Sequence, residues 1–317
     1  MKKVLVMLAI PRKEIESVLP DWELIYPEQE AFTHEELLEK IVDCDAIITV
    51  YGNKLANEVI DAAPKLKMIA NFGAGYDNID INHANSKGIV VTNSPDPVTE
   101  PTAELAMGLM IATARRLGEM NTILKNKEAL QWGVMRNLST TLVGKRLGII
   151  GMGAIGKALA RRAVASGMSV VYHNRKEVEK DVEQALNAEY VSINELLQTS
   201  DVVSLNMPLT QETKKMISTE QLTMMKQSAY LINTARGPVV DEDALIKALQ
   251  NNDIAGAGLD VFENEPTIPN AFRELKNVVL MPHLGTATHE TRGEMSLLVA
   301  ENIKAFFSGM IPPNRVN

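Results

Sequence analysis

Residues 146–176 read RLGIIGMGAIGKALARRAVASGMSVVYHNRK. A short apolar run opens this stretch at 147–150 and predicts a buried parallel strand. Three glycines, Gly151, Gly153 and Gly156, follow at once, and an alanine- and arginine-rich helical segment comes after them. A GxGxxG pattern is weak on its own, but here it stands between a predicted strand and a predicted helix in a unit of βαβ size. This context predicts a dinucleotide site; the alternative is an ordinary strand–turn–helix.

Each glycine has a physical task in such a site. Gly151 permits the tight turn, Gly153 lets the backbone approach a pyrophosphate, and Gly156 lets helix and strand pack closely. The N-terminus of the helix then offers N–H groups and the positive end of its dipole to the phosphates.

The second strand of this unit ends in cations rather than in a carboxylate. An NAD site usually places Asp or Glu about 20 residues after the glycines, where it binds the ribose 2′-OH. This chain has Asn174, Arg175 and Lys176 in that region. Arg and Lys attract a 2′-phosphate, and Arg can bind it through two hydrogen bonds. The sequence therefore favours NADP(H) over NAD(H), with surface cations in a loop as the alternative.

The composition is that of an ordinary globular protein with room for two domains. The chain has 317 residues, of which 45% are hydrophobic and 23% charged, and a formal net charge of −8. The negative charge argues against nucleic acid or an anionic membrane as the main partner. The single cysteine, Cys44, excludes an intrachain disulfide, suits a reducing compartment and is expected to be buried. We find no transmembrane run or signal peptide pattern, so we expect a cytoplasmic protein.

Strand-like and helix-like segments alternate along the whole chain. The predicted strands are 4–8, 46–50, 68–70, 89–92, 147–150, 169–172, 201–206, 229–233, 256–260 and 278–281. A long apolar helix is expected at 102–117, after a turn-rich loop at 93–97 that could act as a hinge and a hinge stretch at 94–101 that contains Pro95, Pro97 and Pro101. A last helix is expected at 294–307. This alternation predicts an α/β fold with two doubly wound parallel sheets.

Ionisable residues follow three of the later predicted strands. Arg236, Glu265 and His283 each follow a different strand, and Glu263 lies two residues before Glu265. Arg can bind a carboxylate and polarise a carbonyl, and His can protonate the oxygen as hydride arrives at carbon. A carboxylate can orient the imidazole and favour its protonated form. The set predicts carbonyl reduction without a metal, although a structural role for each residue stays open and spacing does not choose between the two glutamates.

Seven segments together resemble the D-isomer-specific 2-hydroxyacid dehydrogenase family over nearly the whole chain. They are NFGAGYDNID (71–80), TAELAMGLMIATARR (102–116), LVGKRLGIIGMGAIGKALA (142–160), MPLTQETKKMI (207–217), LINTARGPVVDEDAL (231–245), GLDVFENEP (258–266) and PHLGTAT (282–288). Their order and spacing are far more specific than the glycine loop alone.

The resemblance implies a reaction and its catalytic residues. Arg236, Glu265 and His283 are expected to be catalytic, which selects Glu265 over Glu263. The implied activity is NADPH-dependent reduction of a small 2-oxo acid to the D-2-hydroxy acid, with His283 as acid/base. Glyoxylate and hydroxypyruvate lead the candidate substrates, followed by 2-ketogluconate. The Asn174-Arg175-Lys176 ending of the second strand and the PHLGTAT loop at 282–288 resemble the glyoxylate and hydroxypyruvate reductase branch.

The resemblance also implies substrate and cofactor contacts. Backbone groups of Ala74 and Gly75 are expected to hold the substrate carboxylate beside Arg236. Tyr51, at the carboxyl end of an early predicted strand, is expected to line the substrate pocket. The residues expected at the cofactor are Thr102, Gly151, Gly153, Ala154, Ile155, Gly156, Asn174, Arg175, Lys176, Pro208, Thr213, Thr234, Ala235, Asp260, His283 and Gly285.

The implied domain organisation is discontinuous. Residues 1–98 and 288–317 are expected to form a flavodoxin-like substrate-binding domain, and residues 99–287 an NAD(P)-binding Rossmann domain. Family members are usually dimers, so a homodimer is expected, with the helix from Thr102 at its interface.

Two other functions stay open. One is an NAD-dependent D-2-hydroxyacid dehydrogenase, such as a short D-3-phosphoglycerate dehydrogenase. The other is a corepressor-like protein that senses a dinucleotide and binds partner proteins. Cofactor preference separates the first from the reductase, and the complete set of Arg236, Glu265 and His283 argues against the second.

Overall fold

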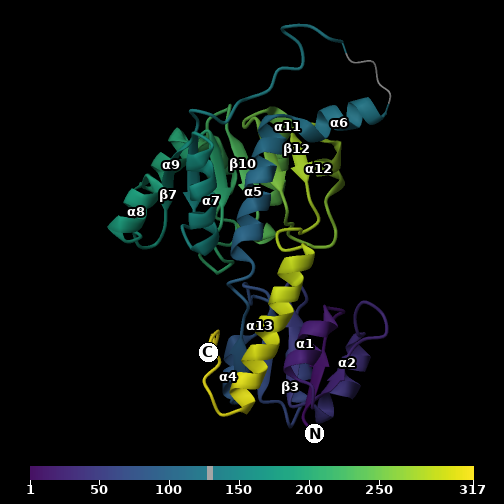
Figure 1. Cartoon of the computed structure of the whole chain (residues 1–317). Coiled ribbons are helices and arrows are strands. Elements are labelled where there is room, and N and C mark those ends of the chain that lie inside the picture. Colours follow the sequence, from purple (N-terminus) through teal and green to yellow (C-terminus); the bar gives the residue numbers. More distant parts are fainter. Residues whose placement is uncertain (127–130) are drawn as a thin grey trace. The chain divides into compact units, whose positions relative to one another are not determined.

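The chain forms two compact units, each built on one parallel sheet. The computed structural model describes residues 1–126 and 131–317. The first unit is Met1–Val98 with Thr286–Asn317, and the second is Thr99–Gly285. Figure 1 shows a sheet with helices packed on it in each unit. Across the described residues, we find no helix with the length and apolar character needed to cross a membrane.

The first unit has a five-stranded sheet in the order β2-β1-β3-β4-β5, with every neighbouring pair parallel. Its strands are β1 (Lys3–Val6), β2 (Glu23–Ile25), β3 (Ala46–Val50), β4 (Met68–Phe72) and β5 (Val90–Thr92). Its helices are α1 (Arg12–Val18), α2 (His34–Lys40), η1 (Ile41–Asp43), α3 (Asn57–Asp61), α4 (Ile81–Ser86) and α13 (His289–Phe307). This strand order is that of flavodoxin-like sheets.

The central strands of the first unit are completely buried, which explains their apolar sequences. Every residue of β3 and β4 is buried, as expected for central strands of a parallel sheet covered on both faces. The last helix, α13, packs against α1 and β4, so the C-terminal segment completes the unit that the N-terminal residues begin. Cys44 is fully buried, as predicted.

The second unit has a seven-stranded sheet in the order β12-β11-β10-β9-β6-β7-β8, again parallel throughout. Its strands are β6 (Arg146–Ile150), β7 (Ser169–His173), β8 (Ala188–Tyr190), β9 (Val202–Leu205), β10 (Tyr230–Asn233), β11 (Gly256–Leu259) and β12 (Val278–Leu280). Its helices are α5 (Thr99–Ala114), α6 (Leu117–Lys125), α7 (Ala154–Ala165), α8 (Lys180–Leu186), α9 (Ile193–Thr199), α10 (Thr219–Met224), η2 (Gly237–Val239), α11 (Glu242–Asn251) and α12 (Asn270–Glu274).

The order of these strands marks where a ligand can bind. Starting from β6, the chain runs outward through β7 and β8, then returns to the other side of β6 with β9. The direction reverses between β6 and β9, and open α/β sheets bind ligands in the crevice at such a point. The order is that of a Rossmann fold, so the predicted fold class is confirmed for both units.

Helix α5 begins three residues earlier than predicted. The sequence predicted helix over 102–117 because Pro95, Pro97 and Pro101 suggested a loop up to that point. In the structure Pro101 lies in the first turn of α5, where a missing N–H removes no helical hydrogen bond. The helix ends at Ala114, and Arg116 adopts a left-handed conformation with φ of 55° before α6 starts.

Tyr172 fastens the loop that carries the predicted cations. Its side chain is fully buried in the second unit. The hydroxyl donates to Glu183 Oε1 at 2.8 Å and accepts the N–H of Val178 at 2.9 Å. Burial raises the pKa of Tyr172 to about 12, so the hydroxyl keeps its proton at neutral pH. The segment between β7 and α8, which contains Arg175 and Lys176, is thereby tied to the core.

We expect Tyr172→Phe to lower the free energy of unfolding of the second unit by about 1–3 kcal/mol, because the N–H of Val178 would lose its acceptor. Urea denaturation followed by circular dichroism measures this change. Tyr76→Phe is the control, since Tyr76 is 39% exposed and should change stability by less than about 0.5 kcal/mol. Equal losses in the two variants would contradict the importance of the Tyr172 hydroxyl.

Candidate active site

The glycine loop lies between β6 and α7, at the point where the strand order reverses. Gly151 has φ of 99°, and a Cβ there would lie 2.7 Å from the backbone of Asn206. A Cβ on Gly156 would lie 2.3 Å from the carbonyl oxygen of Gly151. At Gly153, by contrast, a Cβ would meet no described atom within 4 Å. Two glycines are therefore required by close packing, and the third leaves room beside the start of α7.

Two buried polar atoms near the glycine loop lack a hydrogen-bond partner among the described residues. They are the Oδ1 of Asn206 and the Oγ1 of Thr234. Asn206 follows β9 and Thr234 follows β10, so both lie at the carboxyl edge of the sheet, as the glycine loop does. Buried polar atoms of this kind usually bind water or a ligand. The open space at Gly153 and these two atoms fit a dinucleotide.

The predicted adenosine end is held by local hydrogen bonds. Asn174 Oδ1 accepts the N–H of Met152, in the glycine loop, at 2.7 Å. The Oγ1 of Thr213 donates to the carbonyl oxygen of Pro208 at 2.7 Å. The pKa of Glu212 is held below its usual value by the Thr210 hydroxyl, which donates to its carboxylate, and also by the charge of Arg175.

Those contacts bring much of the predicted cofactor set together. The charge of Arg175 reaches the turn that contains Pro208 and Thr213, and Asn174 contacts the glycine loop. Arg175 and Lys176 are both exposed, so their charged groups can meet a ligand from solvent. Two further members, Ala154 and Ile155, are the first residues of α7.

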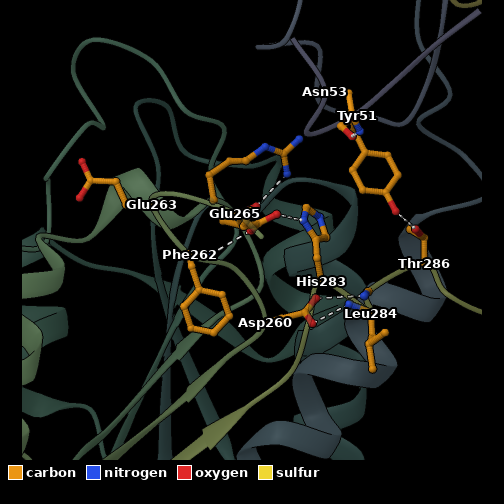
Figure 2. Close-up of polar contacts among 12 residues, drawn as sticks. Tyr51, Asn53, Asp260, Phe262, Glu263, Glu265, His283, Leu284 and Thr286 are labelled. Carbon is orange, nitrogen blue, oxygen red and sulfur yellow. Dashed lines mark hydrogen bonds and ion pairs between the residues drawn. The ribbon is translucent and has the colours of Figure 1, made fainter. Parts of the chain in front are cut away.

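The ionisable residues follow β10, β11 and β12 and meet at one edge of the sheet. The Nδ1 of His283 lies 2.7 Å from Oε2 of Glu265. The other carboxylate oxygen of Glu265 accepts the N–H of Phe262 at 3.0 Å. Figure 2 shows the Glu265 carboxylate directed at the imidazole and the Glu263 side chain directed away from it. The contact to His283 is thus made by Glu265 and not by Glu263.

The ionisation of Glu265 follows from these neighbours. Burial acts to raise its pKa, but the hydrogen bond and charge of His283, the Phe262 N–H and the charge of Arg236 outweigh it. The pKa of Glu265 consequently lies below its usual value, and the group is a carboxylate at neutral pH. It can therefore orient and stabilise a protonated imidazole.

Asp260 holds the loop that carries His283. Its side chain is 1% exposed, and its carboxylate accepts the N–H groups of Leu284 at 2.7 Å and Gly285 at 3.0 Å. Its carbonyl oxygen accepts the N–H of His283 at 2.8 Å. His283 itself has φ of 57°, a left-handed conformation that costs free energy outside glycine. Burial raises the pKa of Asp260, although the two N–H groups and His283 oppose the rise.

Thr102 completes this part of the site. Its Oγ1 donates to the carbonyl oxygen of Gly285 at 3.3 Å. A Cβ on Gly285 would lie 3.3 Å from Thr102 Oγ1 and 3.4 Å from Asp260 Oδ2, so a larger residue would crowd both. Of the three residues, which the family resemblance assigned to the cofactor site, Thr102 and Asp260 thus each form a hydrogen bond with Gly285.

The predicted substrate residues of the first unit lie after β3 and β4. Asn71 Nδ2 donates to the carbonyl oxygen of Gly75 at 2.8 Å, and Asn93 Nδ2 donates to that of Ala74 at 2.8 Å. In a trans peptide the N–H points opposite to the C=O, so these bonds fix the direction of the neighbouring N–H groups. Tyr51 follows β3 directly, and its hydroxyl accepts a hydrogen bond from Arg292 on α13.

Two residues that contact the loop of Glu265 in the second unit were not predicted from the sequence. Gly237 packs on the 261–265 loop so closely that a Cβ would lie 1.9 Å from the carbonyl carbon of Phe262. Glu242, which is 9% exposed, accepts the N–H of Glu263 at 2.7 Å. The sequence signal for Glu242 was only that of an acidic residue in a first helical turn, which is common on solvated helices.

Comparison with known proteins identifies the family of the chain. Residues 107–285 match the family domain described as D-isomer specific 2-hydroxyacid dehydrogenase, NAD binding domain. The chain is 46% identical over 320 residues to the glyoxylate reductase of Thermococcus litoralis, covering 99% of this chain and 96% of that protein.

Solved structures resemble the whole chain as well. An NADPH-dependent glyoxylate/hydroxypyruvate reductase from Sinorhizobium meliloti, in complex with NADP and malonate, matches with a TM-score of 0.85 and 36% identity over 99% of this chain and 96% of that one. A D-lactate dehydrogenase from Aquifex aeolicus, with NAD and lactic acid, matches with a TM-score of 0.88 and 29% identity over 99% of each chain. The predicted family is confirmed: the chain belongs to the D-isomer specific 2-hydroxyacid dehydrogenases, which are NAD(P)-dependent oxidoreductases.

Proposed function

We propose that this enzyme reduces glyoxylate or hydroxypyruvate to the D-2-hydroxy acid with NADPH, with 2-ketogluconate as a further candidate. The observation that carries the proposal is the 2.7 Å contact between Glu265 and His283 in a loop cluster that also contains Arg236. A reductase of 2-oxo acids needs a proton donor, a group that keeps it protonated, and a cation for the carboxylate. The similarity to the Thermococcus litoralis glyoxylate reductase supports the substrate class.

The roles of the residues follow from their atoms. Because Nδ1 of His283 faces Glu265, its Nε2 is the nitrogen that can give a proton to the substrate oxygen. Arg236 can bind the substrate carboxylate and polarise the adjacent carbonyl. The N–H groups near Ala74 and Gly75 are the substrate contacts that the family resemblance implies for the first unit. A reduced dinucleotide, when bound, would supply the hydride that reaches the carbonyl carbon.

The cofactor would be held by the residues that fit it. The glycine loop and the first N–H groups of α7 suit the pyrophosphate, and the buried polar atoms of Asn206 and Thr234 suit further polar contacts. Arg175 and Lys176 suit a 2′-phosphate. Thr102, Asp260 and Gly285 would line the nicotinamide end.

We expect wild-type enzyme to reduce glyoxylate or hydroxypyruvate with NADPH, and His283→Asn to lower kcat by about 10²–10⁴, the range for loss of a general acid. Asn tolerates the left-handed backbone at this position, so the change removes the imidazole with little added strain. The measurement is initial rates with glyoxylate, hydroxypyruvate, pyruvate and 2-ketogluconate, each with NADPH and with NADH.

His34→Asn is the matched control, because the side chain of His34 is 46% exposed in the first unit. It should keep wild-type rates. Full activity in His283→Asn would remove His283 from the mechanism. Preference for NADH and pyruvate would replace the proposal by an NAD-dependent D-2-hydroxyacid dehydrogenase, and tight dinucleotide binding without turnover of any acid would favour a dinucleotide-sensing protein.

We expect Arg175→Ala to weaken NADPH binding about 10- to 100-fold, the equivalent of a lost charge-assisted hydrogen bond. NADH binding should stay nearly unchanged, because NADH lacks the 2′-phosphate. Fluorescence titration of the free protein gives both dissociation constants without turnover. Arg273→Ala, at an exposed arginine of α12, serves as the control. Equal losses for NADPH and NADH would refute the 2′-phosphate role.

We also propose that the enzyme is a homodimer. The segment after α6 exposes a group of apolar side chains, namely Trp132 (89%), Val134 (94%), Met135 (78%) and Leu138 (58%). Contiguous exposed apolar residues usually mark an interaction surface. Light scattering should give twice the mass of the chain, and Trp132→Ser with Val134→Ser should shift the mass toward the monomer. Ile311→Ser, at an exposed apolar residue of the first unit, should not. A wild-type monomer would contradict the proposal.

A further inference from the structure

Glu242 is a buried carboxylate to which the proposed reaction gives no direct role. It is the first residue of α11, and its Oε1 accepts the N–H of Glu263 at 2.7 Å. Burial raises its pKa, and the charges of Glu263, Asp243 and Glu265 add to the rise, while the Glu263 N–H opposes it. A carboxylate here thus costs free energy that an exposed helical acid would not incur.

The peptide that Glu242 holds is also the peptide on which the Arg236 segment packs. A Cβ on Gly237 would lie 1.9 Å from the carbonyl carbon of Phe262 and 2.3 Å from the nitrogen of Glu263. Gly237 directly follows Arg236. The peptide between Phe262 and Glu263 is therefore fixed from two sides, by contact with Gly237 and by the carboxylate of Glu242.

From this peptide the chain turns back toward His283. The Oε1 of Glu265 accepts the N–H of Phe262 at 3.0 Å, and its Oε2 lies 2.7 Å from Nδ1 of His283. Figure 2 marks both contacts of the Glu265 carboxylate, one to the Phe262 backbone and one to the His283 imidazole. A rotation of the Phe262–Glu263 peptide would displace the backbone two residues before Glu265. Glu242 therefore contacts the chain two residues before the residue that faces His283.

We propose that Glu242 is a positioning residue, which acts through the N–H of Glu263 to hold the 262–265 turn and so aims the Glu265 carboxylate at His283. The effect of Glu242 on turnover rests on the proposed function. Its effect on the contact between Glu265 and His283 does not. The role needs an acceptor oxygen at the reach of a glutamate side chain rather than a negative charge, since an amide oxygen accepts the same hydrogen bond.

Three substitutions separate reach from charge. Glu242→Gln keeps the reach and removes the charge, Glu242→Asp keeps the charge and shortens the reach, and Glu242→Ala removes both. Asp243→Ala is the control, because Asp243 is the next residue of the same helical turn and is exposed. The comparison with Asp243 cancels general effects of charge near the start of α11.

Kinetics are the first readout. We expect the Asp and Ala variants to lose about 10- to 100-fold in kcat, as for a misplaced catalytic group. The fall should appear equally in kcat/KM, with unchanged KM and unchanged NADPH affinity, because the Glu265–His283 pair acts in the transition state. Glu242→Gln and Asp243→Ala should stay within about twofold of wild type. A purely structural role would lower the melting temperature and leave kcat of the folded enzyme unchanged.

The second readout needs no substrate. A low-field proton NMR signal of His283 Nδ1–H, assigned by its absence in His283→Asn, reports the hydrogen bond to Glu265. It should shift or vanish in Glu242→Asp and Glu242→Ala and persist in Glu242→Gln and Asp243→Ala. If wild-type enzyme turns over none of the 2-oxo acids, the proposed function fails and this signal alone decides the inference.

Either of two results overturns the role of Glu242. One is an unchanged His283 signal with wild-type kcat in the Asp and Ala variants. The other is an equal loss in Glu242→Gln and Glu242→Ala, which would make the charge and not the acceptor responsible. If Glu242→Ala fails to fold, the contrast between Gln and Asp still tests the proposal, because both keep a polar side chain at the position.

Discussion

The parallel direction of all seven strands is the constraint on which the second unit depends. Because each strand points the same way, the loops that follow β6, β9, β10, β11 and β12 leave from one edge of the sheet. The glycine loop and the residues Arg236, Glu265 and His283 are far apart in the sequence, yet each lies in a loop that follows one of these strands. An antiparallel β10, β11 or β12 would carry its loop to the opposite edge. Strand direction therefore assembles the site before any side chain contributes.

Side chains then hold the loops in conformations that the backbone alone would not prefer. His283 adopts φ of 57°, and a left-handed residue costs about 1–2 kcal/mol. Asp260 offsets that cost by accepting three N–H groups of the loop, one at its carbonyl and two at its carboxylate. Glu242 makes a comparable contact to the loop of Glu265. Burial raises the pKa of both Asp260 and Glu242, and the carboxylate oxygens of both accept hydrogen bonds from backbone N–H groups.

The fold class, and the strand that each site residue follows, could be predicted from the sequence. The signals for them are local: apolar runs, the glycine motif, and the alternation of strand-like and helix-like segments. It missed β2 and β8, which have three residues each and only partial burial, so their apolar pattern is weak. It placed the start of α5 too late, since Pro101 was taken as part of a loop. Between Glu263 and Glu265, spacing could not choose; the family resemblance selected Glu265, and the contact with His283 is made by Glu265. Gly237 and Glu242 escaped prediction because their importance lies in contacts with Phe262 and Glu263, from another loop.

Asn174, which follows β7, supports the glycine loop without placing a negative charge beside Arg175. In an NAD site an acidic residue near here binds the ribose hydroxyl. Asn174 instead directs its amide oxygen at the N–H of Met152, across 2.7 Å, and so supports the glycine loop as a carboxylate oxygen could. The amide carries no negative charge, so it would not repel a 2′-phosphate beside Arg175. The pKa of Glu212 is lowered by the hydrogen bond from the Thr210 hydroxyl and, in smaller part, by the charge of Arg175. Any anion that Arg175 binds would therefore compete with the Glu212 carboxylate for the same positive charge.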